Sequence, residues 1–347
     1  MSNLSLIGKT QDELQSLVKE LEMPAFTAKQ IAIWMYKKKI SSMDEMTDIS
    51  LVRREKLKEI YTVGRLSYAQ RQESTDGTVK YLFPVSRNKY VETVYIPDKE
   101  RSTLCVSTQV GCKMNCRFCM TGKQGFIAQL SSAEIMNQIL SVPESESLTN
   151  VVFMGMGEPL DNIGALFESL EIMTSDYGFA WSPKRITVST IGLIPGLKRF
   201  LEESQCHLAV SIHSPFPAER LSLMPMEKTY PIEKVVELVK QYDFSHQRRV
   251  SFEYILFGGL NDDLKHAQAL ARLLHGIPCR VNLIKYHAIP GVDLPATRLE
   301  TMVPFRDYLS SKGIIATIRA SRGEDILAAC GMLSTKGTPT EENCEFS

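Results

Sequence analysis

Three cysteines lie within eight consecutive positions of the segment GCKMNCRFCMTG, which starts at residue 111. Cys112, Cys116 and Cys119 follow the spacing C-x3-C-x2-C, and thiolates this close together typically bind a metal ion or an iron–sulfur cluster. A structural zinc site needs a fourth cysteine or a histidine nearby, but the nearest following histidine is His207. Three thiolates on a four-iron cluster leave one iron open for a substrate or a cofactor. The spacing therefore favours an open cluster, with a zinc knuckle or functionless cysteines as the alternatives.

Two further cysteines and one glutamate also have side chains suited to catalysis. Cys105 lies in an apolar segment seven residues before Cys112, and Cys330 follows the last apolar segment of the chain. Taken alone, each is most often a small buried hydrophobic residue. Glu92 lies in KYVETVYIP, on a face that is otherwise apolar. It is either an edge residue that reaches water or a buried carboxyl with a raised pKa, suited to proton transfer.

The composition is that of an ordinary globular protein. The chain has 347 residues, 44% hydrophobic and 23% charged, with 40 basic and 40 acidic side chains, so no sequence-wide signal for a polyanion partner is present. The N-terminal segment MSNLSLIGKTQDEL lacks the features of a signal peptide, and no run of about 18 apolar residues follows. We therefore expect a cytoplasmic protein without a membrane segment, whose eight cysteines are reduced.

The periodicity of apolar residues changes twice along the chain. Helical spacing gives way to alternation near residue 66, where Asp76-Gly77 and Asn88 predict the turns of a small β-meander, and strands alternate with helices after Pro97. Apolar strands are expected near residues 102–107, 150–155, 185–190, 207–213, 249–256, 279–286 and 314–320. Six or seven such units predict an α/β fold, an incomplete (β/α)6-type barrel with its ligands at the carboxyl ends of the strands. The expected segments are a helical domain (1–65), the meander linker (66–97), the barrel (98–333) and a disordered tail (334–347).

The helical N-terminal domain carries two capping-box patterns, TQDE from residue 10 and TAKQ from residue 27, which predict helix starts. Basic residues gather at its polar positions, at Lys37–Lys39 and between Arg53 and Lys58. Such runs are most often a solvated face, and an RNA-docking surface is the alternative.

The C-x3-C-x2-C loop resembles that of the radical S-adenosylmethionine (SAM) superfamily, whose members bind a [4Fe-4S] cluster with one iron open to the methionine part of SAM. Five segments, TLCVSTQVGCKMNCRFCMTGKQGF, MGMGEPLDN, AVSIHSP, NLIKYHAIPGV and IRASRGEDILAACGML, are together similar to the RlmN-type RNA (adenine-C2) methyltransferases. The similarity spans nearly the whole chain, including the helical N-terminal domain. It implies a radical-SAM barrel and an enzyme that methylates RNA.

The resemblance also implies the residues that hold the cofactors. Cys112, Cys116 and Cys119 would bind the [4Fe-4S] cluster. The residues implied for the SAM pocket lie at or just beyond the expected strand ends and are Gly157, Glu158, Ser189, Ser211, Ile212 and His213. At one further pocket position, usually Asn in the family, this sequence has His287. A flavodoxin or a ferredoxin would supply electrons, and we expect a monomer.

The chemistry that the resemblance implies is a radical one, because C2 of adenine is electron-poor and direct displacement fails there. One SAM would methylate the Cys330 thiolate, and a second would be cleaved to a 5′-deoxyadenosyl radical that takes hydrogen from this methyl group. The carbon radical would add to C2, and Glu92 would take the C2 proton. Attack of Cys105 on the Cys330 sulfur would then release the RNA and leave a transient disulfide.

The substrates of the family are 23S ribosomal RNA, in the peptidyl-transferase region, and transfer RNA, at the adenine next to the anticodon. The basic runs of the N-terminal domain, Lys123 and Arg248-Arg249 would contact RNA phosphates. Three alternatives stay open. One is the related enzyme type that methylates C8 of adenine and confers antibiotic resistance. The second is a radical enzyme that activates another protein, which would need neither Cys105 nor Cys330. The third is a non-catalytic metal-binding RNA module.

Overall fold

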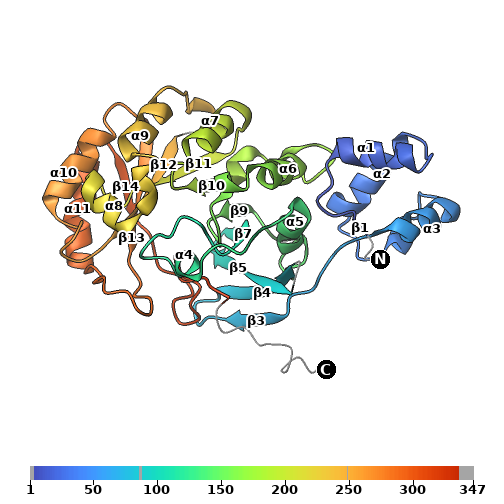
Figure 1. Ribbon diagram of the computed structural model, residues 1–347, viewed down its shortest axis with the longest axis horizontal. Coiled ribbons are helices and arrows are strands. Elements are labelled where there is room, and N and C mark those ends of the chain that lie inside the picture. The colour runs from blue at the N-terminus through green and yellow to red at the C-terminus, as the bar shows by residue number, and fades with distance from the viewer. Residues whose placement is uncertain (1–3, 86–87, 248, 336–347) are drawn as a thin grey trace.

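One sheet of ten strands organises the computed structural model, which describes residues 4–85, 88–247 and 249–335 (Figure 1). The strand order is β14-β13-β12-β11-β10-β9-β6-β5-β4-β3, and the strands from β6 to β14 in this sheet run parallel. The parallel strands are β6 (Arg101–Cys105), β9 (Asn150–Phe153), β10 (Ile186–Thr190), β11 (His207–Ser211), β12 (Val250–Leu256), β13 (Cys279–Lys285) and β14 (Ile315–Ile318). Because β14 and β3 are opposite edges, strand pairing leaves the barrel of the described residues open, which confirms the predicted incomplete barrel.

Helices connect the parallel strands and cover the outer face of the sheet (Figure 1). The longer ones are α5 (Ser132–Leu140), α6 (Ile163–Thr174), α7 (Ile194–Glu203), α9 (Ile232–Lys240), α10 (Leu264–Leu273) and α11 (Leu299–Ser311). Val151, Val188 and Val281 are fully buried, as expected for strands covered on both faces. The loops that follow the strands meet at one end of the barrel, the mouth. They contain the short helices α4 (Met120–Gln124) and α8 (Pro217–Leu223).

The predicted meander forms and extends the same sheet. Its antiparallel strands are β3 (Gln70–Glu73), β4 (Val79–Val85) and β5 (Lys89–Asp98). In the turn between β3 and β4, the Asp76 carboxylate accepts a hydrogen bond from the Thr78 N–H (2.9 Å), and Gly77 has a φ of 83° that glycine adopts without strain. β5 pairs with β6, so Glu92 of β5 lies beside the first strands of the barrel.

Helices and one short strand pair form the N-terminal unit. Its elements are β1 (Leu4–Ser5), α1 (Gln11–Glu20), α2 (Phe26–Ala32), a π-helical turn (Ile33–Lys37), α3 (Leu51–Ile60) and β2 (Tyr61–Thr62). The first capping box is confirmed, since the Thr10 N–H donates to the Glu13 carboxylate (2.8 Å) and the Thr10 hydroxyl accepts from the Glu13 N–H (3.4 Å). The second predicted capping box is wrong. α2 begins one residue before Thr27, whose N–H donates to the Pro24 carbonyl (2.9 Å), so Thr27 is already inside the helix.

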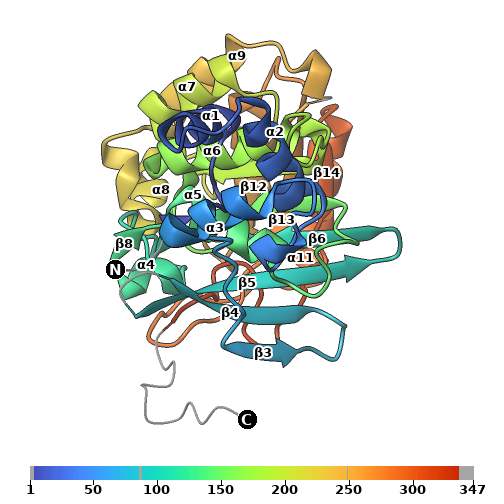
Figure 2. The same cartoon turned by 90° about the vertical axis from the view of Figure 1, so that its right-hand side faces the viewer.

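Figure 2 shows the molecule from the side of this N-terminal unit. Some of its basic side chains form contacts within the protein. Lys39 Nζ lies 3.2 Å from the Glu146 carboxylate, and Arg65 donates to the carbonyl of the last residue of α5. Lys58 Nζ lies 2.5 Å from the Asp44 carboxylate. Part of the positive charge predicted to contact RNA therefore holds the N-terminal unit together or joins it to the barrel.

The segment after β14 returns across the mouth. Ser334 and Thr335, which the sequence assigned to the tail, are bound by Gln124, whose side-chain carbonyl accepts from the Ser334 hydroxyl (3.2 Å) and the Thr335 N–H (3.0 Å). The rest of the predicted tail and Arg248 lie outside the described residues. Across the described ranges, none of the helices has the length and apolar character needed to span a membrane.

Candidate active site

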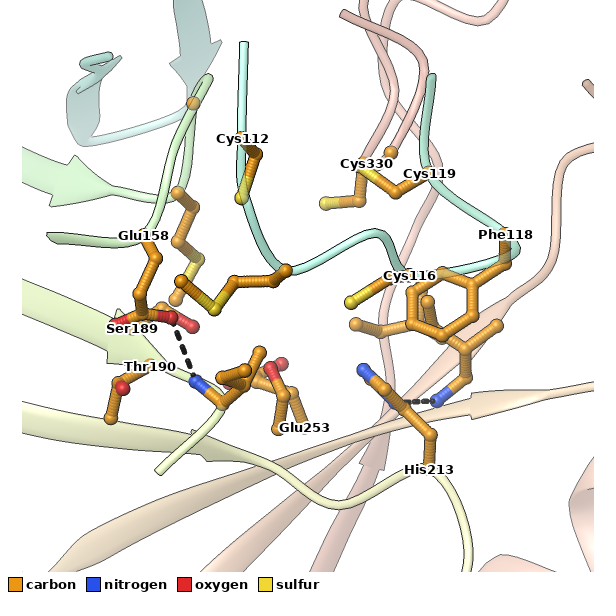
Figure 3. Close-up of a pocket in the computed structure, with 18 of the residues that line it drawn as sticks. Cys112, Cys116, Phe118, Cys119, Glu158, Ser189, Thr190, His213, Glu253 and Cys330 are labelled. Carbon is orange, nitrogen blue, oxygen red and sulfur yellow. Dashed lines mark hydrogen bonds between the residues drawn. The ribbon is translucent and has the colours of Figure 1, made fainter. Parts of the chain in front are cut away.

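The loop after β6 carries the three cysteines and lies over the mouth of the barrel (Figure 3). The strand pair β7 (Gln109–Val110) and β8 (Ala128–Gln129) holds the two ends of the loop together. Within it, the Cys119 N–H donates to the Cys116 carbonyl (3.1 Å). The sulfur atoms of Cys112 and Cys116 point into one cavity (Figure 3).

The donor set of this loop fits an iron–sulfur cluster, because it consists of soft sulfur ligands close together in the chain. Burial raises the pKa of Cys112 to about 12 and that of Cys116 well above its ordinary value, so these thiols need a bound cation to become thiolates. Cys119 lines the same cavity. The described residues contain no group of three histidine, cysteine, aspartate or glutamate side chains that would hold a single metal ion.

The cavity below the loop is open to solvent and is lined by the cluster loop and by residues at the ends of several strands. Among its lining residues are five that were predicted for the SAM pocket: Gly157, Glu158, Ser189, Ser211 and His213. These five lie at or just beyond the carboxyl ends of β9, β10 and β11, where the barrel fold predicted them. The fold therefore brings the predicted cluster ligands and most of the predicted SAM pocket together.

The loop after β9 presents Glu158 from a tight turn. Gly157 has a φ of 104°, and a Cβ added there would lie 2.6 Å from the Cβ of Gln109, so no larger residue fits without a shift. The Glu158 carboxylate accepts hydrogen bonds from the Leu160 N–H (3.1 Å) and the Ile191 N–H (3.0 Å), which joins the loops after β9 and β10 (Figure 3). Burial raises the pKa of Glu158 to about 7, although these hydrogen bonds favour its charged form.

His213 is held as a neutral hydrogen-bond donor. Its φ of 59° lies in the left-handed region, which is uncommon for a residue other than glycine. Nδ1 accepts a hydrogen bond from the Ile255 N–H (3.0 Å), which places the ring proton on Nε2. Burial, and after it the charge of Arg220, lowers the pKa of His213 to about 3. The ring therefore stays neutral beside the cavity (Figure 3).

The two catalytic cysteines predicted from the family resemblance meet at the mouth. Cys330, in the segment after β14, is exposed and lines the cavity (Figure 3). Cys105 is the last residue of β6 and is buried. Burial raises the pKa of Cys105 to about 12, and the negative charge of the Cys330 thiolate acts in the same direction. Neither thiol is in a disulfide.

The segment that carries Cys330 is tethered on both sides of this residue. Before it, the Asp325 carboxylate accepts a hydrogen bond from the Ser74 hydroxyl (2.5 Å) in the turn between β3 and β4. After it, the Ser334 N–H donates to the Glu92 carboxylate of β5 (2.8 Å). The meander therefore fixes the position of the cysteine segment over the mouth.

Glu92 is buried, so the structure supports the second of its two sequence interpretations. Its exposed fraction is 7%, and it forms an ion pair with Lys80 (2.9 Å) of the neighbouring strand β4. Burial raises the pKa of Glu92, although Lys80 acts in the opposite direction. The carboxylate is thus both desolvated and held in a fixed position.

Four residues predicted to bind SAM or RNA lie elsewhere. The side chain of Ile212 is fully buried in the core, and His287 lies outside the cavity lining, with Nε2 2.9 Å from the Ser321 hydroxyl. Lys123 donates to backbone carbonyls of the loop after β13. Arg249 directly precedes β12, which places it at the amino ends of the strands, opposite the mouth.

Glu253 and Arg319 line the cavity although the sequence pattern did not point to them. Glu253 lies within β12, has an exposed fraction of 4%, and accepts a hydrogen bond from the Asn282 side chain (2.7 Å). The Arg319 guanidinium lies 3.6 Å from its carboxylate. Glu253 is a single acidic residue in the apolar run VSFEYIL, the same signal that singled out Glu92.

Arg220 fixes the loops that form one wall of the cavity. Its side chain is buried, and its guanidinium donates to the carbonyls of Ile191 (2.9 Å), Ser211 (3.1 Å) and Ile212 (3.0 Å). The same group forms an ion pair with the buried Glu227. The loops after β10 and β11 are thereby joined through one side chain.

Replacing Arg220 by methionine is expected to lower the free energy of unfolding by about 3–5 kcal/mol, because the charge of Glu227 is left buried without its partner. Urea unfolding followed by circular dichroism measures this loss. The double variant R220M/E227Q is expected to recover part of the stability, since no unpaired charge remains. An R220M chain as stable as the unchanged protein would contradict this role.

Comparisons with known proteins define the class of this enzyme. The model of the Radical SAM superfamily matches residues 106–271, and the model of the ribosomal RNA large subunit methyltransferase N-terminal domain matches residues 4–63. The crystal structure of a radical SAM methyltransferase from Sphaerobacter thermophilus has a TM-score of 0.89 and 37% identity, and the match covers 95% of this chain and 99% of that one. Fold and site are those of a radical SAM enzyme, which uses a [4Fe-4S] cluster and SAM.

Closer relatives identify the family. The probable dual-specificity RNA methyltransferase RlmN of Parabacteroides distasonis is 62% identical over 330 residues, which are 95% of this chain and 96% of that protein. The dual-specificity RNA methyltransferase RlmN of Anaeromyxobacter dehalogenans is 41% identical, over 95% of this chain and 91% of its own. The chain belongs to the RlmN family.

Proposed function

We propose that this chain methylates C2 of adenine in 23S ribosomal RNA and in transfer RNA. The observation that carries the proposal is that two separate sets of thiols line one cavity: the three thiols of the cluster loop, and the thiol of Cys330. Direct methyl transfer to a nucleophilic atom requires neither set. The identity of 62% to an RlmN protein over nearly the whole chain supports the same reaction.

In this proposal, Cys112, Cys116 and Cys119 hold the cluster, while Glu158 and His213 orient SAM. When bound, the cluster and SAM supply a methyl group and a carbon-centred radical. Desolvation of the thiol at the cavity wall raises the pKa of Cys330, but Arg319 acts in the opposite direction by stabilising the thiolate charge. The Cys330 sulfur accepts the methyl group and presents this carbon to the target adenine.

The remaining steps use Glu92 and Cys105. Glu92 would take the proton from C2 of the adenine, a role suited to a desolvated carboxylate whose position Lys80 fixes. The radical adduct must also lose one electron, which would pass to the bound cluster. The Cys105 thiolate then attacks the Cys330 sulfur. A sulfur–sulfur bond forms and the sulfur–carbon bond breaks. The electron pair of the broken sulfur–carbon bond stays with the carbon, which takes up a proton and becomes the methyl group of the product.

The proposal includes the partners. A one-electron carrier such as flavodoxin or ferredoxin reduces the cluster. One chain supplies the proposed cluster ligands, five of the proposed SAM-binding residues and Cys330 to the cavity, and this supports a monomer. A cytoplasmic location is part of the proposal, because both proposed RNA substrates are cytoplasmic.

Mass mapping of adenosine modifications tests the function, with ribosomal and transfer RNA from cells that have or lack this protein. We expect 2-methyladenosine to disappear from both RNAs in the cells that lack it. Loss of 8-methyladenosine instead would favour the C8 enzyme type, and unchanged RNA would contradict the proposal.

Anaerobic purification gives a separate check: the protein should be brown with four irons per chain, whereas a colourless zinc protein would contradict the cluster.

A further inference from the structure

A second groove opens beside the active-site cavity, between the ends of β13 and β14 and the start of α11. It encloses about 1170 Å³. Arg319 lines both the groove and the cavity, so the two are adjacent. Lys285 ends β13, and residues 318–321 end or follow β14. The groove therefore opens at the mouth of the barrel, where RNA must reach Cys330.

Basic side chains dominate the charge of this groove. Lys285, Arg298 and Arg319 line it, against a single acid, Glu300. Lys285 and Arg298 are exposed, and within the described ranges neither has an acidic side chain within 4.0 Å. Arg319 forms an ion pair with Glu253, but 44% of the Arg319 side chain remains exposed. Such a surface attracts anions, and the charges of Lys285 and Arg298 are not neutralised within the described protein.

The wall that carries Arg298 is rigid. The Thr297 hydroxyl donates to the Asp262 carboxylate (2.6 Å), and the Gly258 N–H donates to the Pro295 carbonyl (2.8 Å). A β-bridge also joins residues 257 and 296. The segment before α11 is thus attached to the loop after β12, and the groove is preformed.

We propose that this groove binds the phosphate backbone of the substrate RNA next to the target adenine. The proposal rests on the proposed RNA substrate. Phosphates pair with lysine and arginine side chains without reading base sequence, which suits an enzyme that accepts two different RNAs. The helix α11, whose first residues line the groove, and the helices α1 to α3 lie at opposite ends of the molecule (Figure 1). RNA that crosses the mouth is therefore held on the side opposite the N-terminal unit as well.

The double variant K285A/R298A tests the groove. The probe is fluorescein-labelled transfer RNA, titrated with the holoenzyme at several salt concentrations and followed by fluorescence anisotropy. We expect binding at least about 10-fold weaker near 100 mM salt. The slope of log K against log salt should become shallower by about 1.4, because each lost phosphate contact in single-stranded RNA contributes about 0.7. K285R/R298K keeps both charges and should restore binding.

The matched control is R272A/K312A. These two basic residues line a groove of about 1330 Å³ beside α10 and the C-terminal part of α11, at the amino ends of β13 and β14. This variant also loses two positive charges, but away from the mouth. Its affinity for transfer RNA should therefore stay within about twofold of that of the unchanged chain.

Two results would overturn the groove assignment. One is a K285A/R298A variant whose affinity and salt slope match those of R272A/K312A. The other is a loss of binding without any change in slope, since phosphate contacts must release counterions. Failure of the proposed function appears differently: the unchanged chain would then form no 2-methyladenosine in either RNA.

Discussion

RNA methylation is expected to fall to background when Cys330 is replaced by alanine. Alanine has no thiolate to accept a methyl group, and no other thiol takes the exposed position of Cys330 in the cavity. The cluster ligands are on a different loop, so the variant should still bind four irons. Transfer of radioactive methyl groups from SAM to a ribosomal RNA fragment measures activity, and iron analysis reports on the cluster loop.

Cys206 provides the matched control for this variant. It is a buried thiol directly before β11 and does not line the cavity. Cys206→Ala removes the same atom from the core and should keep most of the activity. Methylation by Cys330→Ala at a rate close to that of Cys206→Ala would contradict the assignment of Cys330 as methyl carrier.

Replacing Cys105 by alanine is expected to leave RNA covalently attached to the protein, up to one RNA per chain. In the proposed mechanism, Cys105 at the end of β6 attacks the Cys330 sulfur, and without this attack the sulfur–carbon bond to adenine stays intact. Radiolabelled RNA should therefore remain on the protein band of a denaturing gel. Product release should stop at the same time.

The double variant C105A/C330A separates this adduct from non-specific attachment. It lacks the methyl carrier, so no RNA should remain on its protein band. Release of methylated RNA by Cys105→Ala at the rate of the unchanged chain would show that another group resolves the intermediate.

The strands of the barrel were predictable because parallel strands buried on both faces are short apolar runs between helices. The position of the cysteine loop followed, since it comes directly after the first of these strands. Glu158 and Ser189 were placed through the family resemblance, and their positions at strand ends agree with the barrel. These features depend on local pattern and on the direction of the chain.

Features that depend on long-range packing were harder to predict. Glu253 and Arg319 line the cavity together because β12 and the segment after β14 meet at the mouth, and the acidic residue within the apolar run of β12 was the one local signal for this pair. His287 is in the expected loop, but Ser321 from the segment after β14 holds its ring outside the cavity lining. Thr27 fits a capping pattern, yet its helix begins one residue earlier. The buried state of Glu92 was one of two interpretations until its pairing with Lys80 was known.

The tether between Ser74 and Asp325 has a consequence for the order in which the protein assembles. The two residues are separated by 251 positions in the chain, so this contact closes one of the longest loops in the molecule. Closing a long loop costs entropy before its contacts form, and such contacts slow folding. On the ribosome, the cluster loop and most of the barrel are synthesised well before Asp325 and Cys330. The methyl-carrying residue is therefore positioned only after synthesis of the chain is nearly complete.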